Sequence, residues 1–295
     1  MLNAILLAFV VTNMLAMGMS LGLRQIVAPL RDIRLVMRVL LANIVLTPMI
    51  AYAISLLPGV KPSLGISLLL LATAAGSPTL PKLAELARGN LAMAVSTTVL
   101  LMAVTVVSMP LLLAFTLPGV SVDMPAIAGM LVAYTLLPLL AGLVLHAWRE
   151  TATAYLAPIF NRISTVCLVS AMILTPIIHF QVMKELFLGG DVLAGLLFIV
   201  LATGLGWLLG GANREVRTVL CLGTAQRNIA AAVVVGIQNF SDPGILGTVI
   251  LGTVILITVA SWAIIVPAAC VFARGTGTSP IAGDGPMTTT EAGRE

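Results

Sequence analysis

The chain has 295 residues, of which 60% are hydrophobic and only 9% are charged, and its mean hydropathy is +1.14. Soluble domains are about 45–50% apolar and about 25% charged, so this composition excludes a soluble globular protein and indicates an integral membrane protein. The formal net charge of +4 comes from residues in short loops between apolar stretches, which favours a role in topology over nucleic-acid binding.

The apolar stretches predict an all-α polytopic membrane protein with nine transmembrane helices, because a helix needs about 20 residues to cross the hydrocarbon core. A membrane β-barrel would instead show short alternating segments. In chain order, the predicted spans are 2–23, 35–57, 62–88, 91–117, 127–148, 157–179, 192–209, 218–240 and 245–272. Residues 273–295 are rich in Gly, Thr, Ser and Pro and are predicted to form a disordered cytoplasmic tail.

Two of these spans, the third and the eighth, are interrupted. In the third, the run 77–82 (SPTLPK) contains two prolines, and each removes an N–H donor and clashes with the preceding turn. In the eighth, the run 224–228 (TAQRN) places a charge where lipid makes it costly. Irregular backbone at membrane depth requires surrounding protein or a water-filled cavity. Two broken spans in corresponding places therefore predict a secondary transporter with its binding site at the breaks.

Basic residues concentrate in one set of alternating loops. That set holds Arg24, Arg31, Arg34, Arg38, Arg88, Arg149, Arg162, Arg214, Arg217 and Arg274, whereas the other holds only Lys61 and Lys184. The positive-inside rule then places the N-terminus outside and the C-terminus in the cytoplasm, in a plasma membrane or a bacterial inner membrane. Within the predicted transmembrane domain, 1–272, the segments 1–117 and 150–272 run in opposite senses and predict an inverted repeat.

Motifs for other chemistry are missing or lie in the wrong context. The string 18–22 (GMSLG) matches a hydrolase nucleophile motif by letter, but it ends a membrane helix, where close packing through Gly18 and Gly22 is expected. The three cysteines form no CxxC pair, and neither HExxH nor a P-loop is present, so we expect no enzyme, no metal site and no ATP-driven transport. His146 and His179 lie near predicted span ends, which favours interfacial or structural roles over a proton relay.

Three strings resemble the bile acid:sodium symporter family: 40–48 (LLANIVLTP), 86–90 (LARGN) and 226–232 (QRNIAAA). The order of the spans is similar to that of nine-helix members up to about Phe272. The resemblance implies a panel domain and a core domain, with the second, third, fourth, seventh, eighth and ninth spans in the core. Substrate would bind between the domains, beside the crossing of the two broken helices.

Several sodium-binding positions of that family are altered in this chain, namely Leu80, Pro81, Ala94 and Leu222. The oxygen donors that remain are the candidate ion ligands Gln226, Thr98, Asn43 and Thr224. A hard cation usually needs several oxygens that include a negative charge, and the shared carboxylate is missing. Sodium is therefore the one candidate cofactor, two-sodium coupling is not expected, and exchange and proton coupling both stay open.

A positively charged side chain lies beside each break. We hypothesise that Lys82 and Arg227 replace the missing sodium ions, neutralise the carbonyl ends of the half-helices and attract an anion. The structural alternatives are that Lys82 extends to the interface and pairs with Glu85, and that Arg227 bonds backbone carbonyls. The candidate substrate-binding residues are Arg227, Asn228, Lys82, Thr79 and Asn13.

The sequence thus predicts a secondary transporter of small organic anions that works by alternating access. Its expected partners are the anion and the lipid bilayer, with no nucleic acid. A membrane sensor that binds an organic anion without transporting it is the alternative.

Overall fold

The computed structural model describes residues 2–20, 22, 28–116, 123–178, 180, 184 and 191–239. Within these ranges every regular element is helical and no strand is present. Four helices are long and apolar enough to cross a membrane: Ile33–Ser55, Leu91–Thr116, Met124–Trp148 and Glu150–Ser170. The all-helical membrane fold is therefore confirmed, whereas the count of nine spans and the inverted repeat stay predictions. The ninth predicted span and the tail lie outside the described residues.

Helices occupy the places of the first eight predicted spans. Their bounds are α1 Leu2–Met19, η1 Ala28–Arg31, α3 Ile33–Leu40, η2 Leu41–Leu46, α4 Thr47–Ser55, α5 Pro62–Thr73, α6 Leu80–Leu86, α7 Leu91–Thr116, α8 Met124–Leu131, η3 Val132–Leu136, α9 Leu137–Trp148, α10 Glu150–Ile178, α12 Asp191–Leu209, α13 Arg214–Ala225 and α14 Ile229–Asn239. The clearest difference from prediction is that α10 begins at Glu150 rather than near residue 157. Polar residues that were predicted to form a loop therefore belong to this helix.

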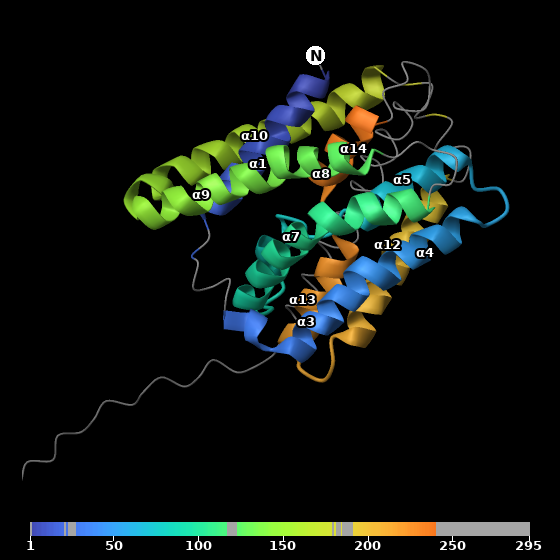
Figure 1. Cartoon of the computed structure of the whole chain (residues 1–295), viewed down its shortest axis with the longest axis horizontal. Helices are drawn as coiled ribbons and strands as arrows, with labels where there is room; N and C mark the ends of the chain where they lie inside the picture. The colour runs from blue at the N-terminus through green and yellow to red at the C-terminus, as the bar shows by residue number, and fades with distance from the viewer. Residues whose placement is uncertain are drawn as a thin grey trace, which may run out of the picture.

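The helices pack in two groups (Figure 1). The panel layer consists of α1, α8, α9 and α10, with α1 packed along both α9 and α10. The core bundle consists of α3 to α7 with α12 and α13, in which α12 packs on α13 and α4 packs on α5. Helix α14 contacts α1, α8 and α5, so the second half of the eighth span touches both groups.

Glycines permit the closest helix approaches. A Cβ atom on Gly142 of α9 would lie 2.5 Å from the Leu15 carbonyl oxygen of α1, and Gly18 faces Gly142 across this contact. The close packing predicted at Gly18 is confirmed, whereas Gly22 lies beyond the end of α1. Between α12 and α13, a Cβ atom on Gly206 would lie 2.5 Å from the Leu220 carbonyl oxygen.

Replacing Gly206 by alanine is expected to destabilise the protein by about 1–3 kcal/mol, because the added methyl group forces α12 away from α13. Gly204 on the same helix is the control, since a Cβ there would meet no described atom within 4 Å. Gly204→Ala should be neutral or stabilise by up to about 1 kcal/mol through helix propensity. Thermal unfolding in detergent should show a lower midpoint only for Gly206→Ala, and equal midpoints would contradict the packing.

Prolines in the second and fifth spans follow π-helical turns instead of ending the helix. The turn η2 ends at Leu46, just before Thr47 and Pro48, and Thr47 Oγ1 donates to the Ala42 carbonyl oxygen at 2.7 Å. Proline has no N–H and clashes with the carbonyl four residues before it, and a wider turn accommodates this. The backbone distortion before Pro48 therefore takes the form of a π-helical turn, and this turn contains Asn43.

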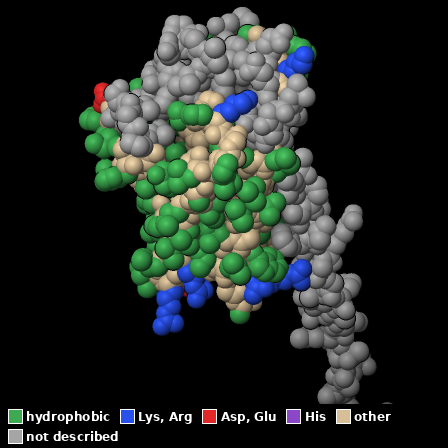
Figure 2. Space-filling view, turned by 90° about the vertical axis from the view of Figure 1, so that its right-hand side faces the viewer, with side chains coloured by type: hydrophobic (Ala, Val, Ile, Leu, Met, Phe, Trp, Pro, Cys, Tyr) green, Lys and Arg blue, Asp and Glu red, His purple; other side chains and the backbone are tan. Residues whose placement is uncertain are grey.

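The described surface is strongly apolar. Hydrophobic side chains form a broad band in Figure 2, with lysine and arginine side chains along its lower edge. Among the exposed residues are Phe115, Trp148 and Leu208, which are 83%, 80% and 79% exposed. Apolar exposure on this scale marks a membrane-contacting surface, which agrees with an integral membrane protein.

Candidate functional site

The first break lies between α5 and α6 and is centred on a glycine. Helix α5 ends at Thr73, well before Pro78, and Gly76 adopts a positive φ of +82°. Helix α6 begins at Leu80, so Pro81 lies in its first turn, where its missing N–H costs nothing. The predicted interruption is present, but Gly76 redirects the backbone there and Pro81 helps to start the second half-helix.

Carbonyl groups of this first break are bonded by neighbouring elements. The Ala74 carbonyl oxygen accepts from the backbone N–H of Asn228 at 2.9 Å, so the two breaks are in direct contact. Two threonines of α7 contact the next carbonyls. Thr105 Oγ1 donates to Ala75 at 3.2 Å, and Thr98 Oγ1 is shared between the Ala94 carbonyl oxygen of its own helix at 2.9 Å and that of Ser77 at 3.3 Å. These bonds meet the requirement that irregular backbone in a membrane be satisfied by surrounding protein.

The second break separates α13, which ends at Ala225, from α14, which begins at Ile229. Asn228 precedes α14, and its Oδ1 accepts from the Ala231 N–H at 3.1 Å, as an N-cap residue does. Gln226 is 1% exposed, and its Oε1 has no hydrogen-bond partner within the described part of the chain. Among the buried side-chain atoms described at the second break, this oxygen is the one without a hydrogen-bond partner.

Arg227 is buried at the point where the breaks meet, with 3% of its surface exposed. Its Nη1 donates to Asn43 Oδ1 at 2.8 Å, and its Nη2 donates to the Asn43 carbonyl oxygen at 3.2 Å. Its Nε donates to the Leu71 carbonyl oxygen at 3.3 Å, and Nη2 also bonds that of Ala72. All these partners are neutral oxygens, and two of them belong to the negative carbonyl end of α5. The guanidinium therefore acts as a buried cation that caps this half-helix.

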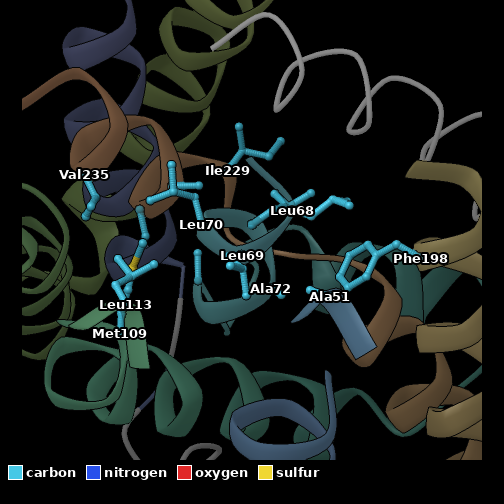
Figure 3. Close-up of a cluster of buried hydrophobic side chains, with 14 of the residues drawn as sticks. Ala51, Leu68, Leu69, Leu70, Ala72, Met109, Leu113, Phe198, Ile229 and Val235 are labelled. Atoms are coloured by element: carbon cyan, nitrogen blue, oxygen red, sulfur yellow. The ribbon is translucent and has the colours of Figure 1, made fainter. Parts of the chain in front are cut away.

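Helix α5 is fixed in place by apolar contacts. Leu68, Leu69 and Leu70 lie in the middle of the buried cluster in Figure 3, with Phe198 of α12 on one side and Ile229 and Val235 of α14 near by. Because α5 cannot shift without disrupting this core, its carbonyl end is held at a fixed position for Arg227.

A cavity of about 620 Å³ lies between the panel layer and the core bundle. We call it the interlayer cavity. Its polar lining residues are Asn13, Ser20, Lys82, Glu85, His146, Glu150, Thr153 and Asn161. Pro78 and Pro81 also line it, so the cavity reaches the first break.

The predicted substrate-binding residues fall into two places. Asn13 and Lys82 line the interlayer cavity. Thr79 sits in the turn before α6, with its Oγ1 2.9 Å from Ser77 Oγ, beside the cavity residue Pro78. Arg227 and Asn228 are buried at the second break and are not among the described lining residues. Their roles as substrate ligands stay predictions.

The predicted ion ligands are only partly brought together. Asn43 Oδ1 accepts a hydrogen bond from Arg227, and the Thr98 hydroxyl contacts the Ser77 carbonyl oxygen of the first break. Thr224 donates to the Leu220 carbonyl oxygen of its own helix at 2.7 Å, while Gln226 Oε1 stays unbonded to described residues. In the described ranges, no group of three His, Cys, Asp or Glu side chains could hold a metal ion. The structural alternative weighed for Arg227, bonding of backbone carbonyls, is what the geometry shows.

Sequence reasoning missed the panel side of the cavity. His146 ends α9, while Glu150, Thr153 and Asn161 lie on α10. The cavity-lining positions 150, 153, 154, 157, 158 and 161 recur at helical spacing, so they form one face of α10. Beginning this span at residue 150 would have revealed that face. Lys82 and Glu85 both line the cavity, and the ion pair weighed for them is not formed in the described structure.

A protein-family model matches nearly the whole chain. The model of the SBF-like CPA transporter family (DUF4137) matches residues 2–267, which include both breaks. This family is related to the bile acid:sodium symporters, so the match supports the resemblance at that broader level. None of the curated proteins matches the chain.

Proposed function

The chain belongs to the SBF-like CPA transporter family, which makes it a transporter in a membrane, and from this premise we propose that it carries small organic anions by alternating access. The observation that carries this proposal is the interlayer cavity, with Lys82 on its wall beside the contacting breaks. Its volume of about 620 Å³ lies within the range of about 300–1,000 Å³ for small-molecule sites.

The position of the cavity supports an alternating-access mechanism. The cavity separates panel helices α1, α9 and α10 from the core helices α6 and α7, so relative movement of the two groups would open or close it. The lining residues Ser20, Glu85 and Glu150 lie near helix ends that the positive-inside rule assigns to the cytoplasm. In that orientation, we propose that the cavity opens to the cytoplasm.

Arg227 supports transport without sodium. Its guanidinium binds an amide oxygen and backbone carbonyl oxygens, which are the neutral ligand types that a hard cation uses. A cation tethered to the protein would hold Asn43 and the end of α5 together throughout the transport cycle. A soluble coupling cation is then not needed at this position.

Uptake into proteoliposomes tests the proposed function. A suitable panel contains radiolabelled pyruvate, taurocholate, methanesulfonate and N-acetylaspartate, each measured against protein-free liposomes. We expect saturable uptake of at least one of these anions. Binding of an anion without any flux would favour the sensor alternative, and neither binding nor flux would reject the anion assignment.

Lys82→Gln is expected to raise the KM for the transported anion by about tenfold, which corresponds to about 1.4 kcal/mol of lost attraction. Lys82→Arg should keep most of the affinity, because it keeps the charge. Lys61→Gln is the matched control, since Lys61 precedes α5 and is not a cavity-lining residue. An unchanged KM in Lys82→Gln would remove Lys82 from the site.

A further inference from the structure

The interlayer cavity carries more negative than positive charge. One lysine, Lys82, and two glutamates, Glu85 and Glu150, line it, so its formal charge is −1 while His146 is neutral. None of these four side chains forms an ion pair with a described residue. A net negative charge weakens the attraction of the cavity for an anion, and a further positive charge beside Lys82 would strengthen it. Histidine is the side-chain type that acquires one between about pH 5 and 8.

The contacts of His146 define which ring nitrogen is available. Its Nδ1 lies 3.2 Å from Thr153 Oγ1. Thr153 is fully buried, and its hydroxyl lies 2.8 Å from the Glu150 carbonyl oxygen and 3.3 Å from that of Arg149, either of which can accept its single proton. With that proton donated to a backbone carbonyl, Thr153 Oγ1 accepts from His146, which assigns the proton of the neutral ring to Nδ1. Nε2 is then the free base of the neutral ring, and it has no partner among the described residues.

Charged side chains near His146 come from α6, from α10 and from Arg149, the residue that follows α9. Helix α1 contributes no titratable side chain; Asn13 on it and Ser20 just after it line the cavity. Helix α10 contributes Glu150, and α6 contributes Lys82 and Glu85. Protonation at Nε2 brings the formal charge of the cavity from −1 to zero.

We infer that His146 is the proton-binding residue that couples anion transport to a proton. The anion binds beside Lys82 when Nε2 is protonated, and one proton crosses with each anion and leaves Nε2 when the anion is released. This inference rests on the proposed function and names its coupling ion. It assigns to His146 a role that its place near a span end did not predict.

The experiment uses the full chain in proteoliposomes, with the pyruvate, taurocholate, methanesulfonate and N-acetylaspartate panel and a pH dye in the lumen. For the transported anion, we expect the KM to rise about tenfold from pH 6 to pH 8, because binding needs the positive charge that a proton brings to the cavity. Lumen acidification should accompany uptake. His146→Gln should lose both the pH dependence and the acidification, while replacement of the other histidine, His179→Gln, should retain them.

The outcomes separate the two proposals. Uptake of an anion that is independent of pH and brings no acidification overturns this inference and leaves the proposed function intact. An unchanged pH dependence in His146→Gln also overturns it. If no panel anion is taken up at any pH, the proposed function fails and this inference fails with it. Even if the His146 variant does not fold, wild-type uptake without pH dependence or acidification overturns the inference.

Discussion

Arg227→Ala is expected to reduce anion uptake by at least about 100-fold while the protein still inserts into the membrane. Removing the guanidinium leaves Asn43 Oδ1 and the carbonyl oxygens of Leu71 and Ala72 without their donor at the contact between the breaks. Leaving a buried acceptor without its donor typically costs about 1–3 kcal/mol for each acceptor, and each 1.4 kcal/mol is about a tenfold effect. Uptake into proteoliposomes measures the loss, and the yield of membrane-extracted protein measures insertion.

Two additions make this test specific to the cation. Arg227→Lys keeps the charge but loses the planar fork, so we expect partial uptake. Guanidinium chloride, added to Arg227→Ala at a concentration that does not denature the protein, should restore part of the activity by entering the vacated site. Normal uptake in Arg227→Ala would reject the proposed role, because it would mean that the crossing of the breaks needs no fixed cation.

Gly76→Ala is expected to destabilise the protein by about 2–5 kcal/mol. The alanine would have to adopt the positive φ of +82°, and its Cβ would lie 2.6 Å from the Met102 backbone nitrogen and 2.9 Å from the Thr98 carbonyl oxygen. Both neighbours are backbone atoms of α7, so they cannot turn aside as a side chain can. Thermal unfolding in detergent, followed by size-exclusion chromatography, measures the effect.

Gly59→Ala is the matched control for this second prediction. Gly59 also has a positive φ, +89°, but a Cβ there would meet no described atom within 4 Å. It should therefore incur only the backbone strain, about 1–2 kcal/mol. A Gly76→Ala midpoint no lower than that of Gly59→Ala would contradict the close contact between the first break and α7.

The positions of the helices were predictable because long apolar stretches and turn residues define them. Helix α7, for example, spans Leu91–Thr116 against a prediction of 91–117. The sequence was less informative about the break itself. The two prolines placed the predicted break at residues 78 and 81. In the structure, α5 ends earlier, and the positive φ of Gly76 redirects the backbone. A single glycine among alanines gives no periodic signal, so only the backbone geometry identifies it.

The site was only half predictable. Arg227 and Lys82 were identified because charges are rare in membrane segments, and both lie close to the breaks as expected. The partner of Arg227 could not be found from spacing, because Asn43 is 184 residues away in the chain. The panel side of the interlayer cavity was not predicted because His146 and Glu150 lie at helix ends, where polar residues are usually exposed to solvent. The tertiary packing of α1 against α9 and α10 turns those ends into the lining of a cavity.

Sodium dependence of uptake tests the central claim, that a fixed arginine replaces a soluble cation where the broken helices meet. Uptake of the transported anion should be measured in proteoliposomes with an inward sodium gradient and with an equal gradient of choline. The account predicts equal initial rates under the two conditions. A rate that requires sodium would contradict it, because Gln226, Thr98 and the backbone oxygens would then have to form an ion site beside Arg227.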